Sequence, residues 1–335
     1  MNLNILWFIL VATLFCVYFF LDGMDFGIGM LIPFLGKEEK ENKKMIYAIG
    51  PTWGANEVWL ITAGGAMFAS FPNWYATMFS GFYIALFLLL VALIIRGISI
   101  EFREKSSSDM GKKVYNIGIG LGNFLVPLLL VVAIACLVRG VPIDKSMEFT
   151  GNLLSLFSPF TLLAGITGIA FFLYHGAVIL EVKVKGEIDK VKEVANIAGI
   201  AAIAGLILTL ITAFFETNIF TKPVSAIFAL LSVLVLVISY LMSRKQIRIW
   251  NIVLNACYVI TTIIAVFSAM FPNVMVSSTK KAYDLTIYNA SSSHYTLSVI
   301  SVITVTLLPI VIGYTIWTYY VFSKKSTGNG QDIEY

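Results

Sequence analysis

The chain has 335 residues, of which 59% are hydrophobic and only 13% are charged. A soluble domain carries about 25% charged residues, so this composition excludes a soluble globular protein and indicates an integral membrane protein. The net charge of +4 gives no reason to expect a nucleic acid partner, because basic residues in membrane proteins mostly mark the cytoplasmic loops. The three cysteines stand singly in apolar runs, which argues against a disulfide framework or a metal site.

Apolar runs of about 20 residues recur along the chain and predict an all-α polytopic membrane protein. We expect nine transmembrane helices, at residues 4–34, 50–71, 74–96, 114–138, 155–181, 195–215, 222–242, 249–271 and 296–322. The connectors after the odd-numbered spans and the carboxyl-terminal tail, together with Arg96 at the end of the third span, hold 18 of the 23 Lys and Arg residues. By the positive-inside rule the amino terminus is outside and the carboxyl terminus is cytoplasmic.

Two short motifs suggest an internal duplication. FFLDG at residues 19–23 and FFLYHG at residues 171–176 end corresponding spans. This pattern favours two four-helix units. We therefore divide the single membrane domain into a first unit (1–140), a second unit (150–271), a ninth helix (295–322) and a cytoplasmic tail (323–335).

Polar residues occur inside the first two spans. Asp22 and Asp25 lie three residues apart and share a helix face, and Asn56 and Glu57 lie about two turns inside the second span. A charged side chain inside a membrane costs at least ~2.5 kcal/mol unless it is paired or faces water. By the rise of a helix, all three carboxylates fall in the cytoplasmic third of the membrane. They are candidates for a proton pathway, or alternatively for hydrogen-bonded contacts between helices.

Other candidates carry a packing interpretation beside a functional one. Gly23 and Gly27 form a GxxxG motif, for which close helix packing is sufficient. Trp53 and Trp59 flank Glu57 and either pack or lie next to a cofactor. His175 either packs by hydrogen bonding or ligates a haem singly. With two histidines on opposite sides of the membrane, the chain offers no bis-histidine haem site and no metal site.

Several charged residues lie where spans are expected to end. We interpret them as a solvated rim at the membrane edge. They are Arg96, Glu101, Arg103, Glu181, Lys183 and Lys185.

Taken together, the motifs resemble subunit II of the cytochrome bd quinol oxidases. The resemblance is carried by LDGMDFGIGML at residues 21–31 and GPTWGANEVWLITAGGAMFASFP at residues 50–72. FSGFYIALFLLL, LLAGITG, HGAVILEVKVKGE, MFPNVMVSST and SSSHYTL follow in the expected order. The similarity therefore covers most of the chain.

The resemblance implies a nine-span subunit of two four-helix bundles and a peripheral helix, in a prokaryotic plasma membrane. It implies a heterodimer with a larger subunit I, which carries two b-type haems, haem d and the quinol-oxidising loop. This chain would bind no haem and hold no catalytic residue. The complex would oxidise quinol and reduce dioxygen to water with cytoplasmic protons. A small single-span subunit and lipids are further partners that the resemblance allows.

One position departs from the family pattern. Asp22 and Asp25 match the family's acids in the first span, but the second-span acid, associated with proton entry, falls at Gly54. The family pattern WDGNQVW is here WGANEVW. Glu57 follows three residues later on the same helix face, so its carboxylate can enter the same polar path.

Two other classes of protein share some of these features. A stand-alone ion-coupled transporter also has intramembrane acids and repeats, although no clear pair of broken helices is present. A structural scaffold whose acids only pack is the third interpretation.

Overall fold

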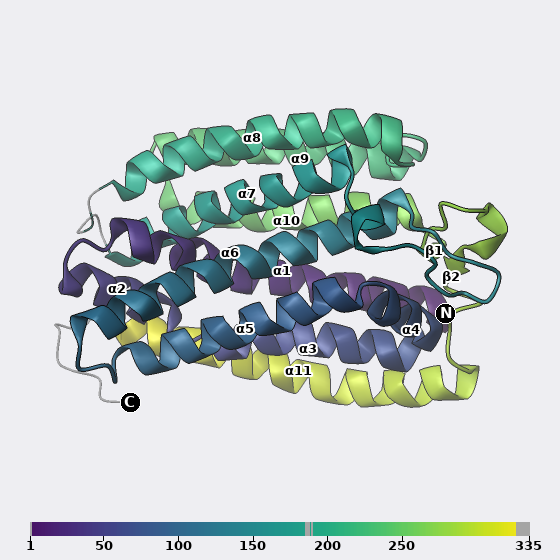
Figure 1. Cartoon of the computed structure of the whole chain (residues 1–335), viewed down its shortest axis with the longest axis horizontal. Helices are drawn as coiled ribbons and strands as arrows, with labels where there is room; N and C mark the ends of the chain where they lie inside the picture. Colours follow the sequence, from purple (N-terminus) through teal and green to yellow (C-terminus); the bar gives the residue numbers. More distant parts are fainter. Residues whose placement is uncertain (1, 185–187, 189, 326–335) are drawn as a thin grey trace.

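The computed structural model describes residues 2–184, 188 and 190–325. Its long helices run along one axis, and a small strand pair lies at one end (Figure 1). The α-helices are α1 (Leu3–Leu35), α2 (Glu39–Ile49), α3 (Trp53–Ser70), α4 (Pro72–Gly81), α5 (Tyr83–Arg103), α6 (Asp109–Arg139), α7 (Pro159–Val184), α8 (Val191–Glu216), α9 (Pro223–Arg244), α10 (Arg248–Met270) and α11 (His294–Lys325). The antiparallel strands are β1 (Asn273–Met275) and β2 (Leu285–Thr286), and the short 3-10 helices are η1 (Leu153–Leu156) and η2 (Lys281–Tyr283).

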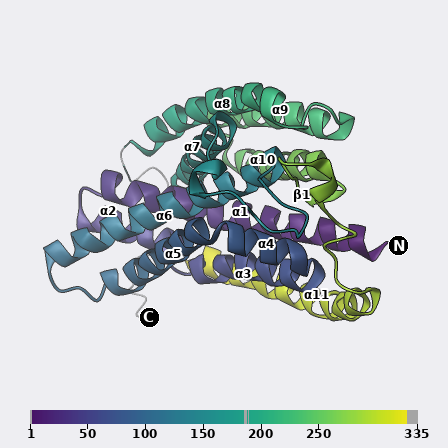
Figure 2. The ribbon, with the colours of Figure 1, turned by 45° about the vertical axis from the view of Figure 1, so that its right-hand side comes forward.

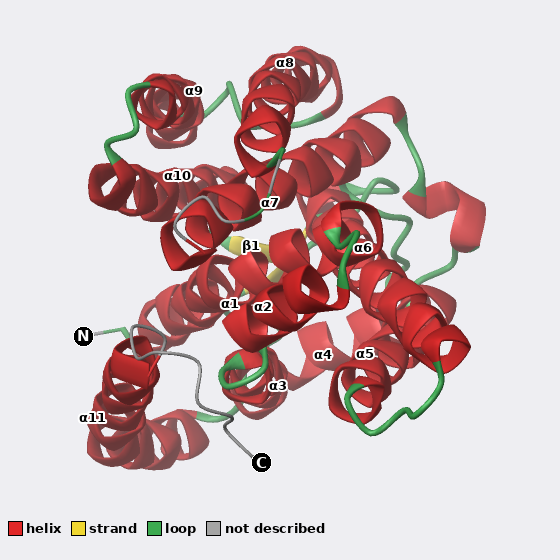
Figure 3. Cartoon of the chain, turned by 90° about the vertical axis from the view of Figure 1, so that its left-hand side faces the viewer, coloured by secondary structure: helices red, strands yellow, loops and turns green. Residues whose placement is uncertain are grey.

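Helix α1 lies at the centre of the molecule, as the end-on view in Figure 3 shows. It packs against α2, α3, α6, α7 and α10. Helices α8 and α9 form an outer layer over α7 and α10, whereas α11 lies on the opposite side next to α3 (Figure 2). Side chains of α1 can therefore contact residues from both the amino-terminal and the carboxyl-terminal half of the chain.

Eight helices in the described part are long and apolar enough to cross a membrane: α1, α5, α6, α7, α8, α9, α10 and α11. Helix α3 occupies the second predicted span but is not among them. Its 18 residues reach about 27 Å at 1.5 Å per residue. It runs alongside α1 and α11, which it contacts (Figure 1).

The third predicted span, 74–96, differs from the structure in its interior and at its carboxyl end. The chain breaks at Phe82 into α4 and α5, and α5 then continues to Arg103. A hydropathy count ends a span at its first charged residue, and Arg96 lies here. The helix runs on because that charge is paired inside the protein, as described below.

Helix α2 lies in a segment for which the sequence predicts only a connector between two spans. Glu38 and Glu41 form a capping box at its start, which satisfies backbone N–H groups that would otherwise lack partners. Met45, Ile46 and Ile49 are buried on one face. The helix is thus held by an apolar stripe that packs across the end of the bundle.

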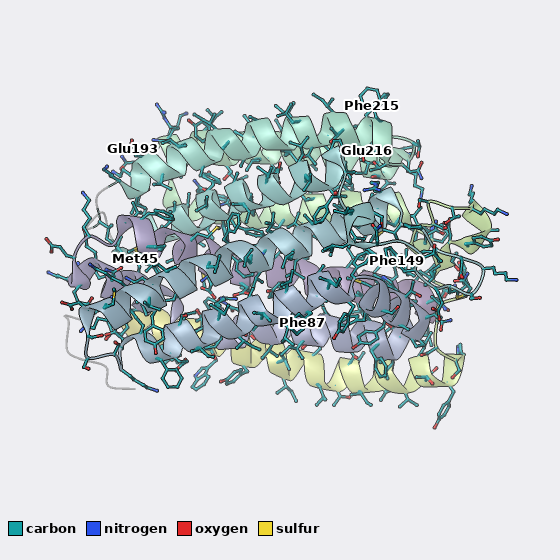
Figure 4. All side chains as sticks on the ribbon, in the orientation of Figure 1. Met45, Phe87, Phe149, Glu193, Phe215 and Glu216 are labelled. Atoms are coloured by element: carbon teal, nitrogen blue, oxygen red, sulfur yellow. The ribbon has the colours of Figure 1, made fainter. Side chains whose placement is uncertain are left out.

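The outward faces of the long helices are apolar. Phe87 on α5 and Phe215 on α8 are exposed, and Phe215 points away from the ribbon in Figure 4. In a soluble protein such a surface would favour association. On the outside of membrane-spanning helices, an apolar surface is expected where the protein contacts lipid or a partner subunit.

A close contact joins α1 to α7. A Cβ added at Gly27 would lie 1.9 Å from the carbonyl oxygen of Phe172 and 2.7 Å from the Cα of Gly176. The two helices therefore approach through facing glycines, as small residues allow in membranes. Gly23 lies one turn earlier, where a Cβ would come 2.8 Å from the Phe172 ring.

Candidate functional site

A buried ion pair joins the first and fifth helices. Arg96 on α5 and Asp22 on α1 are both fully buried, and Arg96 Nη1 donates to Asp22 Oδ2 at 2.8 Å. The other guanidinium nitrogen, Nη2, pairs with Asp22 Oδ1. This two-point geometry matches the planar fork of arginine to a carboxylate. Breaking such a pair would leave an uncompensated charge in the interior.

Two further carboxylates surround the same guanidinium. Glu57 Oε1 on α3 accepts from Arg96 Nη1 at 3.2 Å, and Asp25 Oδ2 on α1 lies 3.9 Å from Nη2. The Glu57 side chain is 22% exposed, whereas Asp25 is fully buried. Three acids therefore share one arginine, and Glu57 connects them to the surface of the chain.

Asn56 extends this site toward α11. Its side-chain Nδ2 donates to Asp25 Oδ2 at 2.7 Å and to the Leu21 carbonyl at 3.3 Å. Its Oδ1 accepts from the Tyr319 hydroxyl on α11 at 2.9 Å. A chain of hydrogen bonds thus runs from Asp25 to the last helix. We call Asp22, Asp25, Asn56, Glu57 and Arg96 the acidic cluster.

Local packing places Arg96 in this cluster. Its stem lies against Gly122 on α6, where an added Cβ would meet Arg96 Cβ at 2.7 Å. Its guanidinium carbon lies 5.0 Å from the centre of the Phe26 ring, within the range of a cation–π contact. These contacts fix the direction in which the side chain points.

The cluster has hydrogen-bonding capacity beyond its internal contacts. Asp25 Oδ1 and Arg96 Nε are buried, and the described residues give neither atom a hydrogen-bond partner. Buried polar groups are normally paired. An acidic site with spare capacity and one partly exposed member is chemically suited to accept and hold a proton.

Four members of this cluster were predicted from sequence, and the fifth was wrongly placed. Asp22, Asp25, Asn56 and Glu57 meet as expected, but Arg96 was assigned to a solvated rim and is fully buried. The signal was present in the sequence: the apolar run continues after Arg96 as Gly-Ile-Ser-Ile, which suggests a helix continuing past the charge.

Other rim predictions were also wrong. Arg103 is fully buried; its Nε donates to Asn116 Oδ1 at 2.8 Å and its Nη2 to Glu39 Oε2 at 2.8 Å. Hydrogen bonds from the Arg103 guanidinium lower the pKa of Glu39 to about 2. This arginine anchors the start of α2 to α5 and α6.

Near the end of α7, Glu181 is buried, and Lys183 donates to the carbonyl of Ala48 at the end of α2. Neither is a solvated rim residue. Glu101 is exposed, as predicted. Lys185 and residues 326–335 of the predicted tail lie outside the described residues.

Position 54 lies on an open face of α3. Gly54 is exposed, and an added Cβ would meet no atom of the described chain within 4 Å. The family acid would therefore stand on the outer surface, whereas the Glu57 carboxylate turns inward to Arg96.

The two tryptophans lie on different sides of α3. Trp53 packs near Gly97 on α5, where an added Cβ would meet its ring at 3.2 Å. Trp59 is buried and lines, with Trp7, an apolar hollow of about 590 Å³ between α1, α3 and α11.

His175 is fully buried on α7 and lies outside the acidic cluster. Its Nε2 lies 3.2 Å from the Phe20 carbonyl oxygen, and its Nδ1 lies 3.1 Å from Asn255 Nδ2. Both ring nitrogens are thus engaged, and neither points at space that a haem iron could occupy. His294 is exposed at the start of α11.

The described residues do not fit a haem or a metal ion. Among them, no group of three His, Cys, Asp or Glu side chains could hold a metal. The two histidines lie in different surroundings and are not paired.

Comparison with known proteins identifies the family. Residues 3–322 match the family model described as cytochrome bd terminal oxidase subunit II. The chain is 40% identical over 327 residues to cytochrome bd ubiquinol oxidase subunit 2 of Bacillus subtilis, covering 97% of each protein. It is 33% identical over 368 residues to cytochrome bd-I ubiquinol oxidase subunit 2 of Escherichia coli, covering 99% of this chain and 97% of the relative.

A solved structure supports the fold. The bd oxidase from Geobacillus thermodenitrificans contains a chain that aligns with a TM-score of 0.78 at 17% identity, covering 98% of this chain and 100% of its own length. The family match spans nearly the whole sequence, including all members of the acidic cluster. On these grounds the protein belongs to the cytochrome bd terminal oxidase subunit II family.

Proposed function

We propose that this chain takes up cytoplasmic protons through the acidic cluster and delivers them to a partner subunit that reduces dioxygen to water. The observation that carries the proposal is the arrangement of Asp22, Asp25 and Glu57 around Arg96, with Glu57 partly exposed. Ionisable groups inside a membrane protein commonly form proton relays.

The names of the relatives indicate which partner subunit this chain would bind. The relatives are named as second subunits of ubiquinol oxidases, which supports a quinol-oxidising complex in which this chain is one member. The two b-type haems and haem d that the resemblance implies would belong to subunit I. A small single-span subunit and bound lipids complete the partners that we propose.

Family membership and eight apolar helices make this a multi-pass cell-membrane protein. We propose nine spans, which are the eight apolar helices and α3. Counting α3 puts 18 of the 23 Lys and Arg residues on one side, which supports an outside amino terminus and a cytoplasmic carboxyl terminus. Residues 1–140 and 150–271 would then form two four-helix units, with α11 peripheral.

In this scheme the residues have separate roles. The Glu57 carboxyl exchanges a proton at the surface of α3 and shares the Arg96 guanidinium with Asp22, so protonation of one acid changes the charge that the other one faces. Arg96 keeps its charge and balances the acids, since a guanidinium does not release its proton in proteins. Asn56 holds Asp25 in place by its amide hydrogen bond.

Substitution of Glu57 by Gln tests the proposal in the assembled complex. Gln keeps the shape and can accept from Arg96, but cannot take up a proton. We expect slower oxygen reduction, with a greater loss at alkaline pH, where protons are scarce. Glu101→Gln, which changes an exposed acid on α5, is the matched control. Unchanged turnover of Glu57→Gln across the pH range, with haem content intact, contradicts the proposal.

The family relationship does not support the alternative of a stand-alone ion-coupled transporter. The relatives covering nearly the whole chain are oxidase subunits.

A further inference from the structure

A second polar network lies inside the other half of the chain. Tyr174 on α7 contacts Ser239 on α9 at 2.9 Å and donates to Asn251 on α10 at 3.2 Å. Ser239 Oγ lies 2.6 Å from Asn255 Oδ1, and Asn255 Nδ2 lies 3.1 Å from His175 Nδ1. All five side chains are at most 1% exposed. The network ends at α1, where His175 Nε2 meets the Phe20 carbonyl.

The partners fix the tautomer of His175. The Asn255 amide oxygen accepts from the Ser239 hydroxyl, so its Nδ2 is the group that faces the ring. An amide nitrogen only donates, and Nδ1 must therefore accept. The proton of the neutral ring then lies on Nε2 and is donated to the Phe20 carbonyl. Setting one ring nitrogen by the bond at the other is a recognised way to orient histidine.

This network is not a route for protons. The Asn255 amide donates at one end and accepts at the other without exchanging a proton readily, and the Phe20 carbonyl only accepts. The ring of His175 also contacts the rings of Phe20 and Phe171, which are uncharged. The network therefore orients a side chain rather than conducting.

The network contacts α1 at the turn that carries Asp22 and Asp25. Phe20 lies two residues before Asp22, and the next carbonyl, that of Leu21, accepts from Asn56 on α3. Side chains from opposite sides of α1 thus hold two consecutive carbonyls. Hydrogen bonds between polar side chains also join helices in membranes, but here the network ends on a backbone carbonyl of α1 next to the one that Asn56 holds.

We propose that His175, oriented by Asn255, is a positioning residue that holds residues 20–25 of α1 so that Asp22 and Asp25 meet Arg96. The inference rests on the proposed role of the acidic cluster in proton uptake. Small displacements matter for such a role, since a misplacement of ~1 Å can cost up to ~100-fold in rate.

Variants at His175 test this in the assembled oxidase. His175→Phe keeps a ring against Phe171 but removes both nitrogens. His175→Gln supplies an amide nitrogen that reaches about as far as Nε2. We expect His175→Phe to lower oxygen reduction several-fold, more at alkaline than at mildly acid pH, and His175→Gln to recover most of the activity. His294→Phe, at the exposed histidine, is the control.

The same change in a Glu57→Gln background separates this inference from the proposed function. If His175 acts through the acidic cluster, His175→Phe adds no further loss once the cluster no longer takes up protons. The inference is overturned if the loss of oxygen reduction in the double variant equals the product of the losses in the two single variants. It is also overturned by a loss equal at every pH with reduced haem content, or by wild-type behaviour of His175→Phe while Glu57→Gln is slow. Should Glu57→Gln itself behave as wild type, the proposed function fails instead, and the inference with it.

Discussion

Arg96 and Asp22 form a two-point ion pair in which neither side chain is exposed. The pair links α5 to α1, and Glu57 joins it from α3. Three helices of the first half of the chain thus meet at one guanidinium. The consequences for stability and for proton uptake can be separated by experiment.

Removal of the arginine should destabilise the protein. Arg96→Gln leaves Asp22 buried without its cation, and breaking a buried pair costs about 3–5 kcal/mol. We expect a lower yield of assembled complex and a lower unfolding temperature in detergent. Arg244→Gln, at an exposed position at the end of α9, should have little effect. Equal thermal stability of the two variants would contradict the importance of the pair.

The contact between α1 and α7 should not tolerate a methyl group. Gly27→Ala would place a Cβ 1.9 Å from the Phe172 carbonyl oxygen, and overpacking costs about 1–3 kcal/mol or more. Thermal unfolding of the purified complex measures the effect. As control, Gly313→Ala on α11 meets no atom within 4 Å and should be neutral or stabilising, because alanine favours helix. A neutral Gly27→Ala would mean that the helices can separate freely.

The anchor of α2 should depend on pH. Hydrogen bonds from Arg103 lower the pKa of Glu39 from 4.5 to about 2. A lowered pKa means that Glu39 stabilises the fold above pH 4.5 and loses this effect as the pH falls through about 2. Glu39→Gln should therefore raise proteolysis within α2 at neutral pH. The difference in proteolysis rate between this variant and the wild-type protein should shrink as the pH falls, because the wild-type Glu39 then becomes protonated and is neutral as well.

For this measurement Glu101→Gln is again the control, since Glu101 is exposed. The prediction would be contradicted if the difference in proteolysis rate between Glu39→Gln and the wild-type protein grew as the pH fell.

An acid at position 54 should substitute for Glu57. Gly54 has open space around its Cβ, and it lies three residues before Glu57, so an acid there would stand at the surface of α3 within one turn of the partly exposed Glu57 carboxyl. We expect Gly54→Asp to restore part of the oxygen reduction lost in Glu57→Gln. Gly54→Asn in the same background has the same size without the charge and should restore nothing. Equal rescue by Asp and Asn would mean that the acid itself is not required.

Much of the fold could be predicted from hydropathy, because each long apolar run must be a helix in lipid. The break at Phe82 and helix α2 could not. An apolar run does not reveal where a helix bends, and α2 is too short and too charged for a hydropathy count. Its capping box, Glu38 with Glu41, was the available signal.

The candidate site was predicted in part. Asp22, Asp25, Asn56 and Glu57 were found because polar residues inside apolar runs are conspicuous. Arg96 was missed as a member because the pairing of charges depends on helix contacts that are distant in sequence, 74 residues in the case of Asp22.

The roles of Tyr319 and Asn255 were not predicted for the same reason. Tyr319 hydrogen-bonds Asn56, and Asn255 hydrogen-bonds His175, and in each pair the two residues lie on helices that are distant in sequence. Neither residue stands out from its neighbours in the sequence.

Proton uptake during a single turnover tests the central claim most directly. The reduced complex, reconstituted in vesicles, is mixed with oxygen, and a pH-sensitive dye on the cytoplasmic side records proton uptake. We predict that Glu57→Gln delays this uptake, whereas Glu101→Gln follows the wild-type course. Proton uptake by Glu57→Gln at the wild-type rate, with haems bound and oxygen reduced, would contradict the assignment of the acidic cluster as the entry site.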